Sequence, residues 1–230
     1  FIGLGNVGGK LAGSLLRNGH DVTVRDLNPD LMAEFVAKGA TSAASPKEMA
    51  EQVDMIITCL PSPAATAHVV EAEDGFLQAL RPGMVWLEMS TTDSAEVVRL
   101  GALVEAKGAL FMECPVSGGC HRAATGNISI FAGCDRETFE RMLPLLTTLG
   151  RRVLHTGPIG TASVLKVMTN YLATANLLSI CEATVPFIST CISNFPPFNI
   201  FPPHSGAYCV RLVIISDTSL NGGVSKIFAA

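Results

Sequence analysis

The sequence predicts an α/β fold, in which a doubly wound and mostly parallel sheet carries helices on both faces. Three observations support this prediction. Short apolar runs alternate with stretches of helical periodicity from residue 1 to about residue 155, as a parallel sheet with crossover helices requires. A glycine-rich turn directly follows the first apolar run. With 230 residues, 48% of them apolar and 16% charged, the chain can also bury a substantial core.

The elements follow one another along the chain. A first strand ends at Ile2, and the helix after the turn stops at Asn18-Gly19, a common helix C-terminal signal. Residues 22–24 are the second strand. Further strands are predicted over 55–60, 84–88, 109–113, 128–132 and 153–155, and helices over 46–52, 64–70, 94–107 and 136–149.

One long helix is predicted from residue 160 to residue 183. It is too apolar for a surface helix, but Lys166, Asn170, Asn176 and Glu182 interrupt it, so no membrane span is expected. We expect this helix to pack between other elements. Beyond it, five prolines crowd into residues 186–203 without periodicity, and no domain pattern is found over 186–230.

Charge and cysteine content limit the classes of function. The net charge of −4 provides no basic field, so nucleic acid is not an expected partner and a small molecule is. Seven cysteines without a Cys-x-x-Cys pair predict reduced thiols in an intracellular protein. The five histidines have no metal-ligand spacing, so no metal site is predicted. The sequence does not distinguish the cytoplasm from the mitochondrion.

The turn Gly3-Leu4-Gly5-Asn6-Val7-Gly8 has the spacing G-x-G-x-x-G between a strand and a helix. Such a turn lets a pyrophosphate approach the backbone at the helix N-terminus. Asp26 ends the second strand 18 residues after Gly8, where a carboxylate can accept hydrogen bonds from ribose hydroxyls. These features predict a dinucleotide site that prefers NAD. Arg25 beside the ribose position leaves NADP possible.

Two further segments carry candidate chemistry. Ser117-Gly118-Gly119 follows an apolar strand and can form a small anion cradle suited to a carboxylate, although a plain strand-to-helix turn uses the same residue types. Lys166 and Asn170 are spaced i, i+4 and project from one helix face. A lysine there either extends to solvent or is buried, and burial lowers its pKa toward values useful in acid–base catalysis.

Taken together, these segments resemble the β-hydroxyacid dehydrogenase family and are most similar to its 3-hydroxyisobutyrate dehydrogenase-like members. The resemblance covers residues 1 to about 183. It rests on F-I-G-L-G-N-V-G at 1–8, C-L-P at 59–61, E-M-S-T-T-D at 88–93, P-V-S-G-G at 115–119 and G-P-I-G-(x)5-K-x-x-x-N at 157–170. The fold implied is a Rossmann-type domain over 1–160, an interdomain helix over 161–185 and an unassigned tail over 186–230. The family's all-helical second domain has no counterpart in the tail.

The resemblance also implies roles for individual residues. It implies that the catalytic residues are Lys166, which takes the hydroxyl proton during hydride transfer, and Asn170, which orients the substrate. Ser117, Gly118 and Gly119 would bind the substrate carboxylate. The cofactor would be held by Gly3, Gly5, Asn6, Val7, Gly8, Asp26, Leu60, Pro61 and Ser90. Thr169 stands where the 6-phosphogluconate branch has histidine, which argues against that branch.

Three functions follow as hypotheses. The favoured one is an NAD(P)-dependent oxidoreductase that converts a small β-hydroxyacid to its semialdehyde. The second is an NADPH-dependent reductase of small semialdehydes such as succinic or glyoxylic semialdehyde. The third is a non-catalytic dinucleotide-binding module, because the second domain is not recognised. The family implies a homo-oligomer, but we do not expect one for a chain with this tail. Two interpretations of residues 186–230 remain, an aberrant end and a divergent appendage, and the first is favoured.

Overall fold

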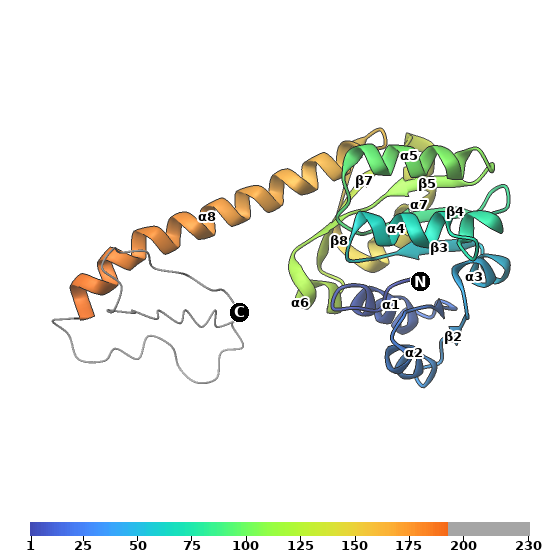
Figure 1. Cartoon of the computed structure of the whole chain (residues 1–230), viewed down its shortest axis with the longest axis horizontal. Coiled ribbons are helices and arrows are strands. Elements are labelled where there is room, and N and C mark those ends of the chain that lie inside the picture. Colours follow the sequence, from blue (N-terminus) through green and yellow to red (C-terminus); the bar gives the residue numbers. More distant parts are fainter. Residues whose placement is uncertain (193–230) are drawn as a thin grey trace. The chain divides into compact units, whose positions relative to one another are not determined.

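The computed structural model describes the backbone of residues 1–192 and the side chains of residues 1–184. Contacts divide the chain into two units, and the first, Phe1–Leu177, contains a sheet with helices on both sides (Figure 1). The predicted α/β fold is therefore confirmed. The part of the Pro-rich tail beyond Ile192 lies outside the described residues.

Three parallel strands form the centre of the main sheet. They are β3 (Met55–Thr58), β4 (Val85–Glu88) and β5 (Leu110–Glu113), and their register brings Thr58, Glu88 and Glu113 side by side at the strand ends. Strand β7 (Ile128–Gly133) runs antiparallel to β5 and to the short β6 (Val116–Ser117), and parallel to β8 (Gly150–Gly157). The sheet is mostly parallel, as the sequence predicts, with β7 adding the antiparallel pairs.

The first predicted strand is represented by Ile2. This residue forms parallel bridges with both Arg25 and Thr58, so it lies between the end of β1 (Thr23–Val24) and β3. Strand β1 pairs in parallel with β2 (Thr41–Ser42). The turn that follows Ile2 therefore opens at the carboxyl ends of the parallel strands, where ligands of doubly wound sheets bind.

Helices cover both faces of the sheet. They are α1 (Gly8–Arg17), α2 (Pro29–Val36), α3 (Pro46–Gln52), α4 (Pro63–Glu71), η1 (Phe76–Gln78), α5 (Ser94–Glu105), α6 (Gly119–Ala124) and α7 (Arg136–Leu149). The bounds of α3 and α7 match the sequence prediction. Both start at a side-chain cap, Ser45 in one and Asp135 in the other. Helices α2 and α6 were not predicted.

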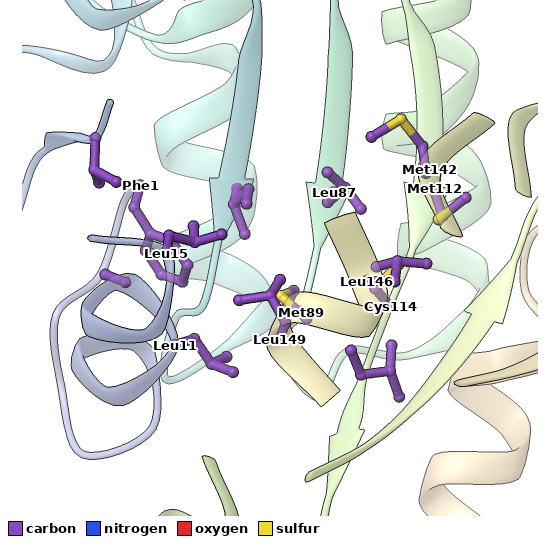
Figure 2. Close-up of a cluster of buried hydrophobic side chains, with 14 of the residues drawn as sticks. Phe1, Leu11, Leu15, Leu87, Met89, Met112, Cys114, Met142, Leu146 and Leu149 are labelled. Atoms are coloured by element: carbon purple, nitrogen blue, oxygen red, sulfur yellow. The ribbon is translucent and has the colours of Figure 1, made fainter. Parts of the chain in front are cut away.

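Two hydrophobic clusters fill the space between the sheet and these helices. Figure 2 shows the first, where Leu11 and Leu15 of α1 and Leu146 of α7 pack near Leu87 and Met112 of the sheet. The second is formed by residues from α3 to β5, and its centre is Trp86, whose ring lies 4.5 Å from that of Phe111 between ring centroids. The strands are therefore buried on both faces, as a sheet between two helical layers requires.

Helix α8 spans Thr161–Ile192 and is longer than the predicted helix. Ala162, Ser163 and Lys166 are buried at its start, whereas Val167 and Tyr171 are 51% and 72% exposed. The expected packing between elements thus holds only for the start of the helix among the described side chains. The segment Thr161–Thr184, with a mean hydropathy of 1.2, has the length and composition of a membrane span, a criterion that core helices of water-soluble proteins also meet.

Candidate functional site

A cavity of about 760 Å³ opens at the carboxyl ends of the strands. Its lining includes every residue that the sequence assigned to a cofactor, namely Gly3, Gly5, Asn6, Val7, Gly8, Asp26, Leu60, Pro61 and Ser90. Gly118, Gly119 and Lys166 line the same cavity. Segments from the first strand to the last helix of the unit therefore converge on one pocket.

The glycines of the turn meet different requirements. A side-chain carbon on Gly3, whose φ is +93°, would lie 2.3 Å from the carbonyl oxygen of Cys59, and one on Gly8 would lie 2.1 Å from the carbonyl oxygen of Gly3. These two positions must be glycine for the chain to pack. A side-chain carbon on Gly5 would have no atom of the described residues within 4 Å and would occupy open space at the cavity. Gly5 therefore leaves room for a ligand.

Helix α1 starts at this turn without the features that usually stabilise a helix N-terminus. Val7 at the cap position provides no side-chain hydrogen bond, and the first turn contains no acidic residue. By contrast, Asn28 caps α2 and Asp93 caps α5 through their side chains. The amides of Gly9 and Lys10 already donate to backbone carbonyl oxygens of the turn, so it is the positive end of the α1 dipole that is available to an anion such as a pyrophosphate.

Asp26 is held rigidly at the edge of the cavity. Its Oδ2 accepts a hydrogen bond from the Leu4 backbone amide at 2.6 Å, and its Oδ1 accepts one from the Asn28 amide at 2.8 Å. A carboxylate has further lone pairs, which can accept bonds from ribose hydroxyls, and its charge disfavours a nearby phosphate. Arg25 also lines the cavity, and its guanidinium donates to the backbone carbonyl of Asp26.

A buried carboxylate supports the other half of the cavity. The hydroxyl of Ser90 accepts a hydrogen bond from the Leu60 amide at 2.8 Å, and the Ser90 amide donates to Glu88 Oε1 at 2.6 Å. The hydroxyl of Thr58 donates to the other Glu88 oxygen. Burial raises the pKa of Glu88 to about 7, against hydrogen bonds from Ser90 and Thr58 that lower it. Glu88 thereby ties two cavity loops to the sheet.

Glu88 is the first residue of the motif at 88–93, but the sequence predicts no role for it. Its position after three buried residues of β4 and directly before a serine loop was the available signal. Cys59, which also lines the cavity, is close enough for the Glu88 charge to act on it. Burial first, and then that charge, raise the pKa of the Cys59 thiol to about 12, so the thiol stays protonated at neutral pH.

The predicted anion cradle is only partly directed at the cavity. Gly118 and Gly119 line it with φ values of +128° and +80°. Ser117 belongs to β6, where it pairs with Ser129, and it is half-buried outside the cavity lining. The two glycine positions thus lie in the pocket, with the serine one residue away from it.

Lys166 and Asn170 differ in their surroundings although they share a helix face. Lys166 lines the cavity with only 9% of its surface exposed, and burial lowers the pKa of its amine. Asn170, one turn later, is exposed and does not line the cavity. The structure therefore brings together the predicted lysine and the cofactor residues but leaves the predicted asparagine outside.

A second buried carboxylate contacts the start of α8. Glu113 Oε1 accepts a hydrogen bond from the Ala162 amide at 2.9 Å, and Oε2 accepts bonds from the Ser163 amide at 3.0 Å and the Ser163 hydroxyl at 2.5 Å. This contact could not be inferred from the sequence, because Glu113 and Ser163 lie 50 residues apart. Among the described residues, no group of three metal-ligating side chains is found.

The turn and its surroundings fit a dinucleotide cofactor. Open space at Gly5, an uncapped helix behind it and a fixed carboxylate on the next strand form the geometry through which a Rossmann-type domain binds a dinucleotide. Residues 1–157 match the NAD binding domain of 6-phosphogluconate dehydrogenase, and the chain belongs to this family. NAD, the cofactor predicted from the turn, is thereby confirmed for this domain.

Curated relatives and solved structures extend the match. The chain is 35% identical over 183 residues to a probable mitochondrial 3-hydroxyisobutyrate dehydrogenase of Dictyostelium discoideum, covering 80% of this chain and 57% of that protein. It is 35% identical to a 3-sulfolactaldehyde reductase of Escherichia coli, covering 81% and 65%. A structure of Mycobacterium tuberculosis 3-hydroxyisobutyrate dehydrogenase with L-serine has a TM-score of 0.77 at 29% identity, covering 83% and 64%.

These matches confirm the family resemblance predicted from the sequence. They place the chain among oxidoreductases related to the hydroxyacid dehydrogenases. The chain spans a little over half the length of the Dictyostelium relative and just under two thirds of the Escherichia coli one.

Proposed function

We propose that this chain is the cofactor-binding part of an NAD-dependent dehydrogenase that oxidises a small β-hydroxyacid, similar to 3-hydroxyisobutyrate, to its semialdehyde. One observation carries the proposal. Lys166 is buried in the same cavity that contains the dinucleotide turn, so a base and a hydride acceptor would face one bound substrate. Similarity to a 3-hydroxyisobutyrate dehydrogenase supports this substrate class.

In the proposed mechanism, Lys166 takes the proton of the substrate hydroxyl. Desolvation favours the neutral amine, which has a free lone pair for this proton. Bound NAD supplies the acceptor for the hydride that leaves the hydroxyl-bearing carbon. The substrate thus loses one proton and one hydride and becomes a carbonyl compound, and the amine becomes an ammonium ion.

The other predicted residues have positioning roles in this proposal. Gly118 and Gly119 line the cavity, and in this proposal their backbone amides and the hydroxyl of Ser117 bind the substrate carboxylate. Asn170 would orient the substrate from the helix. Its exposure in the described structure means that this role requires the substrate, or another part of the enzyme, to extend the pocket by one helical turn.

A second candidate is the reverse reaction, reduction of a small semialdehyde. The similarity to the Escherichia coli 3-sulfolactaldehyde reductase favours it. In that direction Lys166 would donate its proton to the developing alkoxide. The Dictyostelium relative is named as mitochondrial, whereas the other relative is bacterial, so the proposal does not include a compartment.

The test combines cofactor binding with turnover. Fluorescence titration with NADH, and separately with NADPH, should give saturable binding with a preference for NADH. Oxidation of 3-hydroxyisobutyrate is then followed by NADH formation in the wild type, in Lys166→Ala and in Lys107→Ala, an exposed lysine outside the cavity. Loss of the base should lower kcat by about 10²–10⁴-fold, and the Lys107 variant should match the wild type. Unchanged turnover in Lys166→Ala would refute the mechanism.

A further inference from the structure

The carboxylate of Glu113 lies at the boundary between the sheet and α8. Glu113 is the last residue of β5, and its surface is fully buried. Its two oxygens accept three hydrogen bonds from the first turn of α8, at 2.5–3.0 Å. The donors are the hydroxyl of Ser163 and two backbone amides. Amides at a helix N-terminus have no partners within the helix. Glu113 therefore satisfies the start of this helix.

This cap differs from the side-chain caps of five other helices. In α2, α3, α4, α5 and α7 the cap is the residue directly before the helix. Such a cap stabilises the N-terminus of the helix but does not attach it to another element. Glu113 caps α8 from another element, 49 and 50 residues away in sequence. A cap of this kind fixes the helix end relative to the sheet.

A glycine on the neighbouring strand β7 leaves the space that the Glu113 carboxylate occupies. Glu113 pairs across the sheet with Gly133 of β7. A side-chain carbon on Gly133 would lie 2.2 Å from Glu113 Oε1, so any larger residue there would displace the carboxylate. Three elements, β5, β7 and α8, thus define the position of a single side chain.

The helix face that contacts Glu113 is also the face that buries Lys166. Ala162 and Lys166 are separated by four residues and Ser163 and Lys166 by three, so these side chains share one face. All three residues are buried, whereas Val164 and Val167 are 50% and 51% exposed. A shift or rotation of the first turn would therefore move Lys166 relative to the cavity.

We propose that Glu113 is a positioning residue, which locks the first turn of α8 to the sheet and thereby holds Lys166 inside the cofactor cavity. Its effect on Lys166 is transmitted through the helix, since no ion pair between the two side chains is found among the described residues. The importance of this position for catalysis rests on the proposed function. The placement of Lys166 itself does not.

The test measures the state of Lys166 without requiring turnover. Competitive labelling with acetic anhydride over a pH series, read by mass spectrometry, gives the labelling rate and the titration midpoint of each lysine. In the wild type, the midpoint of Lys166 should lie below the usual lysine value of about 10.4. Glu113→Gln keeps the shape but replaces one acceptor by an NH₂ group facing amide donors. Its Lys166 midpoint should rise toward the usual value, and each unit of rise lowers the neutral fraction at neutral pH about tenfold.

Asp135→Ala is the matched control. It removes the cap of α7, where Asp135 accepts from the Thr138 amide at 2.8 Å, and it leaves α8 untouched. Urea unfolding should show a loss of stability in both variants. Only Glu113→Gln should change Lys166 labelling, and Glu113→Asp, which keeps the charge, should restore part of the wild-type profile. NADH titration of each variant verifies that the cofactor domain is folded.

Two results would overturn the inference. One is an unchanged Lys166 profile in a folded Glu113→Gln protein, which would reduce Glu113 to a helix cap. The other is a wild-type Lys166 that labels like the exposed Lys107, because there would then be no buried state to hold. A protein that shows the expected labelling shift but does not oxidise 3-hydroxyisobutyrate would disprove the proposed function and support the positioning role.

Discussion

Replacing Glu88 by glutamine should remove a contribution to stability whose pH dependence is opposite to that of most carboxylates. A carboxyl group that gains hydrogen bonds in the native state usually stabilises the fold at higher pH. Glu88 behaves differently, because burial raises its pKa to about 7 from an ordinary value of 4.5. The native state therefore keeps this proton up to about pH 7, whereas the unfolded chain releases it near pH 4.5.

The sign and the size follow from this difference. Stability from the protonated carboxyl is fully present below about pH 4.5 and is lost as the pH rises through 7, because the native state binds more protons than the unfolded state in this window. A shift of roughly 2.5 units at 1.36 kcal/mol each corresponds to about 3 kcal/mol. The glutamine variant has no such proton, so its stability should lack this component.

The assay is urea unfolding of the wild type and Glu88→Gln at several pH values from about 5 to about 8. The free energy of unfolding of the wild type, minus that of the variant, should decrease by about 2–3 kcal/mol across this range. Glu34→Gln, at an exposed position on α2, is the control and should give a constant difference. A constant difference for Glu88→Gln would refute the reasoning, because it would mean that the native carboxyl is ionised throughout.

Three other predictions follow from the cavity. Asp26→Asn should raise the affinity for NADPH relative to NADH by about tenfold in fluorescence titrations, since it removes a charge that repels a 2′-phosphate; an unchanged ratio would mean that Asp26 does not select the cofactor. Gly5→Ala should fold normally in urea unfolding but bind NADH more weakly, whereas Gly3→Ala should lose at least about 1–2 kcal/mol of stability because of its positive φ; equal effects on stability would contradict the distinction between the two glycines. Iodoacetamide at about pH 8 should alkylate Cys120 before Cys59, because the raised pKa keeps the Cys59 thiol protonated; mass spectrometry showing similar rates would disprove the shift.

Local signals explain how much of the fold could be predicted from the sequence. Helix α7 begins at Asp135 and α3 at Ser45-Pro46, and both were predicted with their observed bounds. Helix α2 has a similar Asn28-Pro29 start, and its Leu31 and Phe35 lie one helical turn apart, so the signals for this helix are present in the sequence although it was not predicted. Helix α6 has six residues, too few to show a period. Short elements with little buried surface leave little pattern in a sequence.

The candidate site was predictable to the extent that it depends on the backbone turn. The glycine spacing and Asp26 were found because their geometry requires particular residue types at fixed intervals. The i, i+4 spacing placed Lys166 and Asn170 on one face, but the cavity reaches only Lys166, and where a cavity ends is decided by tertiary packing. The contacts of Glu88 and Glu113 join strands and helices that are distant in sequence, and spacing contains no information about them.

The register of the central strands determines the distance between the two halves of the pocket. Glu88 and Glu113 are paired neighbours on β4 and β5, in strands about 4.8 Å apart. One supports the loops at Leu60 and Ser90, and the other supports the helix that carries Lys166. The positions of both carboxylates therefore depend on the same backbone hydrogen bonds between β4 and β5. The spacing between the cofactor loops and the amine is therefore set by the backbone pairing of two central strands and not by the loops themselves.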